Sequence, residues 1–159
     1  MQIRRLLAAN LPEVAVSHKM CFTVKITILS KTAYLRILRQ LLKDISGIVG
    51  EQYFTKKAVG LCSVALVEAV DNAIFHAHSE CEDKPIDIMI GVDDYGITMS
   101  VTDNGSSFLV DSHMVNSYPE LVAIDGRGLY LINKIMTKVE FKRVSEGNKV
   151  VMLYKLRPE

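Results

Sequence analysis

The stretch VTDNGSSF, residues 101–108, decides how the chain folds around it. Asn104-Gly105 is a strong hairpin signal, because both residues accept the positive φ angles of a type I′ turn. The segment that follows, LVDSHMVNSYPELVAIDG (109–126), does not alternate between polar and apolar residues and contains a proline. A hairpin turn needs a partner strand directly after it, so a simple hairpin fits poorly. The stretch is better explained as the floor of a small-molecule pocket.

The composition indicates one ordinary globular domain. The 159 residues are 49% hydrophobic and 23% charged, and 19 Lys and Arg against 18 Asp and Glu give a net charge of +1. This balance argues against nucleic acid as a partner, since such binding needs a basic face. No uninterrupted apolar run approaches the ~18 residues of a membrane span, and three scattered cysteines fit a reduced, cytoplasmic protein. We expect a single domain over residues 1–159, with its core at 21–156 and a peripheral start at 1–20.

The hydrophobic pattern predicts an alternation of strands and helices. Alternating β-branched and polar residues predict three strands, at residues 21–29, 85–92 and 96–103. Apolar residues at helical spacing predict three helices, at residues 31–50, 55–79 and 127–136, and Gly47 and Gly50 are expected to close the first of them. The strands at 85–92 and 96–103 are expected to form a hairpin with its turn at DDYG (93–96), and the segment 138–156 a second hairpin with its turn at 146–148.

The predicted helix 55–79 carries a polar stripe. Glu68, Asn72 and His76 fall within roughly 80° of one another at 100° per residue. A solvated helix face would explain the stripe, but Ala69 and Phe75 flank it, which favours the wall of a cleft. The Asn oxygen is a hard neutral ligand for Mg²⁺, which takes the rest of its shell from water and nucleotide phosphates. The Glu can accept a proton from a hydroxyl group aligned on the terminal phosphate.

Two further motifs suit a nucleotide. A buried carboxylate at a strand end, here Asp103, can accept a hydrogen bond from an exocyclic amine, and Gly105 lets a flat ring approach the backbone. Gly126 and Gly128 open a predicted helix, where backbone N–H groups and the helix dipole favour an anion. A lone Gly-x-Gly is equally typical of an ordinary loop-to-helix junction.

In this order the three motifs resemble the GHKL ATPase superfamily, which has the Bergerat nucleotide-binding fold. EAVDNAIFHA (68–77) resembles its N box, DNGSSF (103–108) its first glycine box and GRGLYLI (126–132) its second. The form E-A-V-x-N-A-I-x-H is most similar to the bacterial anti-sigma-factor serine kinases of partner-switching systems. The resemblance covers residues 21–156 and implies an α+β two-layer sandwich, with a mixed, mostly antiparallel sheet and helices packed on one face.

The resemblance implies a role for each motif residue. Glu68 is implied to be the catalytic base, Asn72 the Mg²⁺ ligand and Asp103 the acceptor for the adenine amino group, with Gly105 beneath the ring. The remaining nucleotide contacts are implied for Gly126, Arg127, Gly128 and Leu129. Residues 109–125 are implied to form a lid over ATP.

Three positions within the motifs are less determined. His76 matches the histidine of the N box and is expected to be a packed, hydrogen-bonded side chain. Arg127 suits a phosphate contact and a plain surface position equally well. Ser107 stands where the wider superfamily has the second glycine of DxGxG, a change that fits the anti-sigma branch and alters the lid.

The resemblance also implies the activity. It implies an ATP- and Mg²⁺-dependent serine-protein kinase and anti-sigma factor that phosphorylates an anti-anti-sigma antagonist, and a homodimer that has a sigma factor as its other partner. A sensor histidine kinase needs a phosphoacceptor helix pair before this domain, which residues 1–20 are not expected to supply. Gyrase- and chaperone-type ATPases need a transducer domain after it, and none is expected here. The alternative is a non-catalytic ATP-binding adaptor that sequesters a partner; the presence of Glu68 favours the kinase.

Overall fold

The sheet is the organising element of the molecule. The computed structural model describes residues 20–105 and 127–156. Its strands are β1 (Met20–Leu29), β2 (Pro85–Asp93), β3 (Gly96–Asp103), β4 (Lys138–Val144) and β5 (Gly147–Lys155). They form one sheet in the order β1-β2-β3-β5-β4, and every pairing among these strands is antiparallel. The predicted strands and both hairpins are confirmed, and no parallel pairing joins the described strands.

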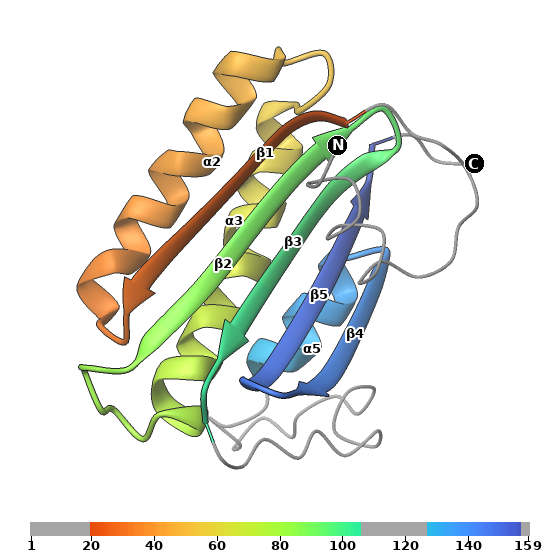
Figure 1. Ribbon diagram of the computed structural model, residues 1–159. Coiled ribbons are helices and arrows are strands. Elements are labelled where there is room, and N and C mark those ends of the chain that lie inside the picture. The colour runs from red at the N-terminus through yellow and green to blue at the C-terminus, as the bar shows by residue number, and fades with distance from the viewer. Residues whose placement is uncertain (1–19, 106–126, 157–159) are drawn as a thin grey trace.

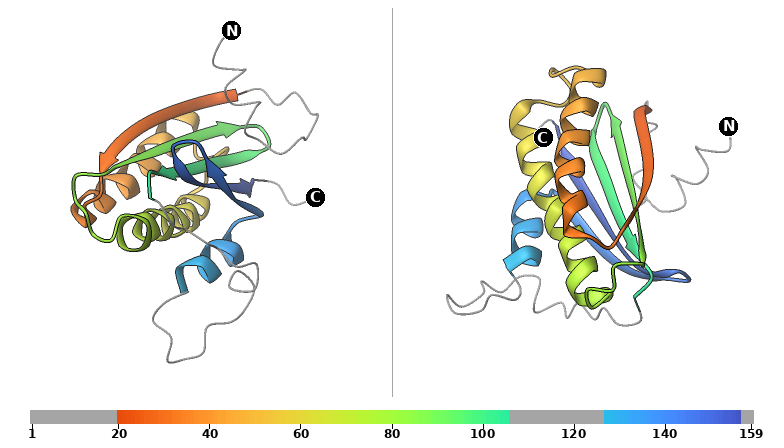
Figure 2. Two further views of the ribbon diagram at one scale, coloured as in Figure 1. Left: turned by 60° about the horizontal axis from the view of Figure 1, so that its bottom comes forward. Right: turned by 90° about the vertical axis from the view of Figure 1, so that its left-hand side faces the viewer.

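The helices cover one face of this sheet (Figures 1 and 2). They are α2 (Leu35–Val49), α3 (Lys56–Asn72) and α5 (Arg127–Ile135), with a 3-10 turn at Thr32–Tyr34 before α2 and a π-helical turn, η2, at Ala73–Ala77 after α3. In Figure 1, α2 lies towards the β1 edge, α5 behind β5 and β4, and α3 between them. The two-layer α+β arrangement is therefore as predicted.

Local chemistry fixes the ends of the helices. The Thr55 side chain caps α3 by accepting a hydrogen bond from the Ala58 backbone N–H at 3.2 Å, which satisfies one of the unpaired donors of a helix start. Gly50 ends α2 at φ +97°, a conformation that glycine adopts without steric cost. Gly47 was expected to help end this helix, but it lies inside α2.

The core lies between α3 and the sheet. Alternate residues of β2 and β3 are fully buried against the helices, among them Ile86, Ile88, Ile90, Ile97 and Met99. Leu66 and Val70 of α3 are 0% exposed and Leu38 and Leu42 of α2 complete the layer. Burying a side chain of this size contributes about 1.5–3 kcal/mol each.

The central helix, which runs from α3 into η2, is strongly apolar. By length and composition, the continuous helical segment Lys56–Ala77 could cross a membrane, although Glu68 and Asp71 interrupt its apolar run. In the structure 56% of its most apolar window is buried, because the sheet, α2 and α5 pack around it. Its apolar character thus serves the core of the two-layer fold.

Candidate active site

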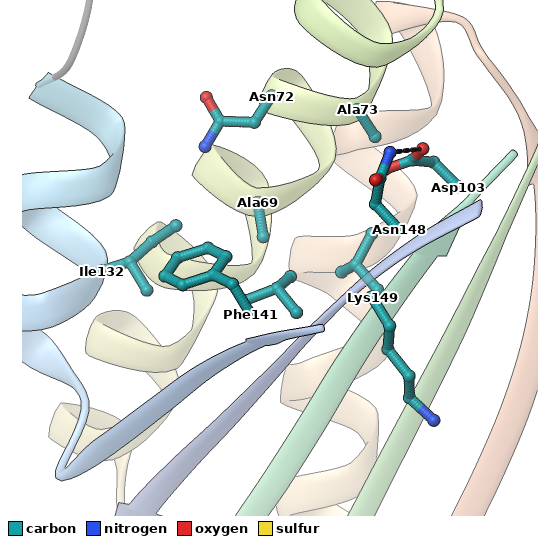
Figure 3. Close-up of a pocket in the computed structure, with 10 residues that line it drawn as sticks. Ala69, Asn72, Ala73, Asp103, Ile132, Phe141, Asn148 and Lys149 are labelled. Carbon is teal, nitrogen blue, oxygen red and sulfur yellow. Dashed lines mark hydrogen bonds between the residues drawn. The ribbon is translucent and has the colours of Figure 1, made fainter. Parts of the chain in front are cut away.

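A pocket opens between α3 and the β3–β5–β4 part of the sheet (Figure 3). Ala69, Asn72 and Ala73 form its helical wall. Its floor and far side consist of Val101, Asp103, Ile132, Phe141, Asn148, Lys149 and Val150. Of the predicted polar stripe only Asn72 lines this pocket, together with Ala69, whereas Phe75 is 45% exposed.

Asp103 is the buried acid of this pocket. It ends β3, is 9% exposed, and its Oδ1 atom accepts hydrogen bonds from the Gly105 backbone N–H and from Asn148 Nδ2, both at 2.8 Å. Both of the hydrogen bonds that described residues donate to this carboxylate go to Oδ1. Within residues 20–105 and 127–156 no group donates to the other oxygen, which is able to accept a further hydrogen bond, as an amine reader requires.

Gly105 is needed for a reason that the sequence did not reveal. A Cβ atom at this position would lie 2.5 Å from the Ala77 carbonyl oxygen and 2.7 Å from its Cβ atom. The backbone after β3 therefore runs directly against the end of η2, and any side chain would push the two segments apart. The close contact that requires glycine at position 105 is therefore with Ala77 at the end of η2.

Sequence reasoning missed two polar residues beside Asp103. Asn148 is 5% exposed and lies on β5; Arg143 lies on β4, and its Nη1 atom donates to Asn148 Oδ1 at 2.7 Å and to the Gly105 carbonyl oxygen at 3.1 Å. Asn148 was assigned to the turn at 146–148. Its position two residues before inward-facing Val150 and four before Met152 is the signal that could have placed it in the pocket.

Glu68, Asn72 and Gly128 meet where α5 begins. A Cβ atom on Gly128 would lie 2.7 Å from Glu68 Oε2 and 3.4 Å from Asn72 Oδ1. Two of the three predicted motifs are thereby brought together, because α5 packs along α3. Of their neighbours, Arg127 is exposed and Leu129 is 9% exposed.

Several predicted features lie outside the described residues. They are Gly126, Ser107 and the lid at 109–125.

The environment of Glu68 strengthens it as a base. Burial raises the pKa of its carboxyl group, and the negative charge of Asp71 one turn further along α3 raises it again, against the opposing effect of Arg39 on α2. Burial also raises the pKa of Asp71, and no residue in the described part of the chain forms a hydrogen bond with its buried Oδ1 atom. A carboxylate with a raised pKa accepts a proton more readily than an ordinary one.

The structure buries a different histidine from the one that was expected to be packed. His76 is exposed, so the expectation of a packed side chain was wrong. His78 is the buried one, at 1% exposed. Burial lowers the pKa of His78, and the nearby negative charge of Asp103 partly opposes this effect.

The donor set around Asn72 suits a cation shared with phosphate. Within residues 20–105 and 127–156, no group of three or more His, Cys, Asp or Glu side chains is placed to hold a metal ion. Magnesium does not require such a cage, since it usually combines one or two protein oxygens with water and substrate phosphates. Asn72 Oδ1, facing the start of α5, fits that pattern.

Comparison with known proteins gives a consistent result. The family described as "Histidine kinase-like ATPase domain" matches residues 29–154. Serine-protein kinase RsbW of Listeria innocua is 30% identical over 116 residues, which is 69% of this chain and 73% of that protein. Serine-protein kinase RsbW of Bacillus cereus is 28% identical over 136 residues, 81% of this chain and 82% of that protein.

A solved structure shares the fold. The crystal structure of the RsbU and RsbW domains of Rv1364c from Mycobacterium tuberculosis matches 84% of this chain with a TM-score of 0.58 at 14% identity. This chain spans 31% of that longer protein, so the likeness concerns the arrangement of helices and strands alone.

Proposed function

The chain belongs to the histidine kinase-like ATPase domain family, and we propose that it is an ATP-dependent serine-protein kinase that acts as an anti-sigma factor. One observation carries the proposal: Glu68, a base with a raised pKa, lies beside Gly128 and Asn72, and Asn72 lines the pocket that has the buried acceptor Asp103 at its floor. Relatives matched over most of the chain are named serine-protein kinases.

In this proposal Asp103 accepts a hydrogen bond from the adenine amino group, and the phosphates extend towards Gly128 at the start of α5. Backbone N–H groups at the start of α5, together with the helix dipole, favour the negative charge of the phosphates there. Asn72 would hold Mg²⁺, which when bound would supply positive charge to offset the charge of the transferring group.

The chemical step is transfer of the terminal phosphoryl group to a protein serine. The serine Oγ forms a bond to the γ-phosphorus, the bond from that phosphorus to the bridging oxygen of ADP breaks, and Glu68 accepts the hydroxyl proton. Because the transition state is loose, little deprotonation is needed at the moment of attack, and most of the catalysis comes from position and charge.

The proposed partners are a sigma factor and a small antagonist with a phosphorylatable serine, and the proposed compartment is the cytoplasm. We further propose a homodimer through β1 and α2, which expose Leu29, Ile37 and Ile48 at 40%, 52% and 68%. Sedimentation equilibrium should give the dimer mass, and Ile48→Ser should lower it.

The test is direct transfer. The purified chain is incubated with γ-labelled ATP, Mg²⁺ and small candidate antagonists from the same genome, and label on serine is the expected result. Label that appears with the parent and not with Glu68→Gln assigns the transfer to this site. ATP binding and capture of an antagonist without any transfer would support the non-catalytic adaptor instead.

A further inference from the structure

Three polar side chains form a row across the C-terminal half of the sheet. Asp103 on β3 is the register partner of Asn148 on β5, and Asn148 is the register partner of Arg143 on β4. Asn148 Nδ2 donates to Asp103 Oδ1 at 2.8 Å (Figure 3), and Arg143 Nη1 donates to Asn148 Oδ1 at 2.7 Å. The row connects the pocket floor to the edge strand.

The chemistry of the row determines which way the Asn148 amide faces. A guanidinium group has donors only, so Arg143 requires an acceptor, and the Asn148 oxygen supplies it. The amide nitrogen must then face Asp103. The reverse orientation would place an amide oxygen against a carboxylate oxygen and an amide nitrogen against the guanidinium, so the Asn148 amide would lose its hydrogen bonds to both neighbours in the row.

The same atoms hold Gly105. Its carbonyl oxygen accepts from Arg143 Nη1 at 3.1 Å and from Asn148 Nδ2 at 3.3 Å, while its N–H donates to Asp103 Oδ1. Asp103 Oδ1 therefore receives two N–H groups, one from the backbone and one from Asn148. These hydrogen bonds join Asp103, Gly105, Asn148 and Arg143 into one closed network, which holds the Asp103 carboxyl group in place.

We propose that Arg143 and Asn148 are positioning residues that set base specificity, by holding the Asp103 carboxyl group in place through Oδ1 so that its other oxygen can accept from an exocyclic amino group. This proposal deepens the nucleotide-binding function proposed above and rests on it. Both residues act on the base through Asp103. Arg143, at the other end of the row, lies on the edge strand β4.

A network that only joins β4 and β5 to β3 would behave differently. Loss of a purely structural contact weakens the pocket for every nucleotide alike. Loss of the geometry that reads the amino group lowers the affinity for ATP and leaves the affinity for an analogue without the 6-amino group almost unchanged. The ratio of the two affinities therefore separates the two roles.

The experiment measures dissociation constants by calorimetry for Mg-ATP and for the triphosphate of purine riboside, which lacks the amino group. A hydrogen bond to a charged group corresponds to about 10- to 100-fold in affinity, and we expect the parent protein to prefer ATP by that factor. In Asn148→Leu the preference should fall below about 3-fold, with most of the change in the affinity for ATP.

Arg143 provides the second variant, and being exposed at the surface it can be changed with less risk to folding. Arg143→Met should reduce the preference for ATP, whereas Arg143→Lys should retain it, because an ammonium group also donates without accepting. Lys142→Met is the matched control: it also removes a β4 cation, one paired to Glu140 outside the row.

The outcomes are distinct. A preference that is unchanged in Asn148→Leu and Arg143→Met, with both affinities lowered equally, would reduce the row to a structural contact and overturn the proposal. A parent protein that binds both triphosphates equally would overturn it as well and leave nucleotide binding intact. A parent protein that binds neither would refute the proposed function and this inference with it.

Discussion

Gly128 faces Glu68 so closely that a Cβ atom on it would lie 2.7 Å from the Oε2 atom of the carboxylate. The carboxylate is at the end of a flexible side chain, so it can move aside at little cost in stability. Movement of this group, however, removes the proposed base from its position. A change at Gly128 should therefore affect catalysis far more than folding.

We predict that Gly128→Ala lowers the rate of serine phosphorylation at least about 10-fold, since misplacement of a reacting group by 1 Å can cost 100-fold. Its free energy of unfolding should stay within about 1 kcal/mol of the parent value. Gly60→Ala is the control, because Gly60 lies in α3 of the same helix layer and a Cβ atom on it would meet nothing within 4 Å. That variant should keep full activity and gain up to about 1 kcal/mol of stability. A fully active Gly128→Ala would contradict the assigned geometry.

Glu68→Gln tests the base directly. The substitution keeps the size of the side chain and removes its basicity, and general-base catalysis is typically worth 100- to 10,000-fold. We expect the low end, about 100-fold, because the transition state is loose. The affinity for Mg-ATP should change only a few-fold, since Asn72 and Asp103 are untouched. Equal single-turnover rates for variant and parent would remove Glu68 from the mechanism.

Magnesium nucleotides should stabilise the fold. A ligand at 100 times its dissociation constant contributes about 2.7 kcal/mol, which for a chain of this size raises the melting temperature by roughly 5–10 °C. Asn72→Ala should largely remove the dependence of this shift on Mg²⁺ and keep a smaller shift with the nucleotide alone. Absence of any shift at millimolar ATP or ADP would exclude both the kinase and the adaptor.

Asp103 should make the pocket discriminate against guanine. Guanine turns a carbonyl oxygen towards the carboxylate, and leaving one charge of a buried pair unsatisfied costs about 3–5 kcal/mol. GTP should therefore bind at least about 100-fold more weakly than ATP. In Asp103→Asn the side chain can donate as well as accept, so the difference should narrow. Equal affinities of the parent for ATP and GTP, measured by calorimetry, would mean that Asp103 does not read the base.

His78 should make stability depend on pH in the weakly acidic range. Burial lowers its pKa in the folded state below the ordinary 6.5, so the unfolded chain binds a proton that the folded chain does not. The free energy of unfolding must then fall as the pH drops below about 6.5. Urea unfolding at several pH values should show a flatter profile for His78→Phe than for the parent. A parent-like slope in His78→Phe would refute the assignment.

The sequence predicted what is local. Alternation along β2 and β3 and the 3.6-residue spacing of α2 depend on neighbours in the chain, and these elements lie where they were expected. The hairpin between β2 and β3 closes as predicted, with Asp93 Oδ1 accepting from the Tyr95 and Gly96 N–H groups at 2.9 and 2.8 Å.

The histidine error has a local cause that periodicity could not reveal. Ideal α-helical geometry places residues 72 and 76 on one side of the helix. In the structure the chain widens into the π-helical turn η2 after Asn72, and the His78 N–H bonds to the Ala73 carbonyl oxygen five residues earlier. The extra residue in that turn rotates His76 out to solvent and His78 into the interior.

The missed pocket residues depend on contacts between distant parts of the chain. Asn148 is a typical turn residue, and only its pairing with Asp103, 45 positions earlier, makes it part of the pocket. Arg39 influences Glu68 because α2 packs against α3. The alternation along β5 could have placed Asn148 on the inward face, but it does not identify Asp103 as its partner, and the influence of Arg39 on Glu68 leaves no periodic signal in the sequence.

The pairing of β3 with the last strand also has a consequence for synthesis in the cell. Proteins emerge from the ribosome with the N-terminus first, at about 5–20 residues per second, so Glu68, Asn72 and Asp103 are present before Asn148 and Arg143 exist. Until β4 and β5 emerge and dock on β3, Asp103 lacks the side-chain donor that fixes it. If Asp103 reads the base as proposed, the nucleotide site is complete only after the last strand of the sheet has docked, so ATP should stabilise the finished sheet and not the shorter nascent chain.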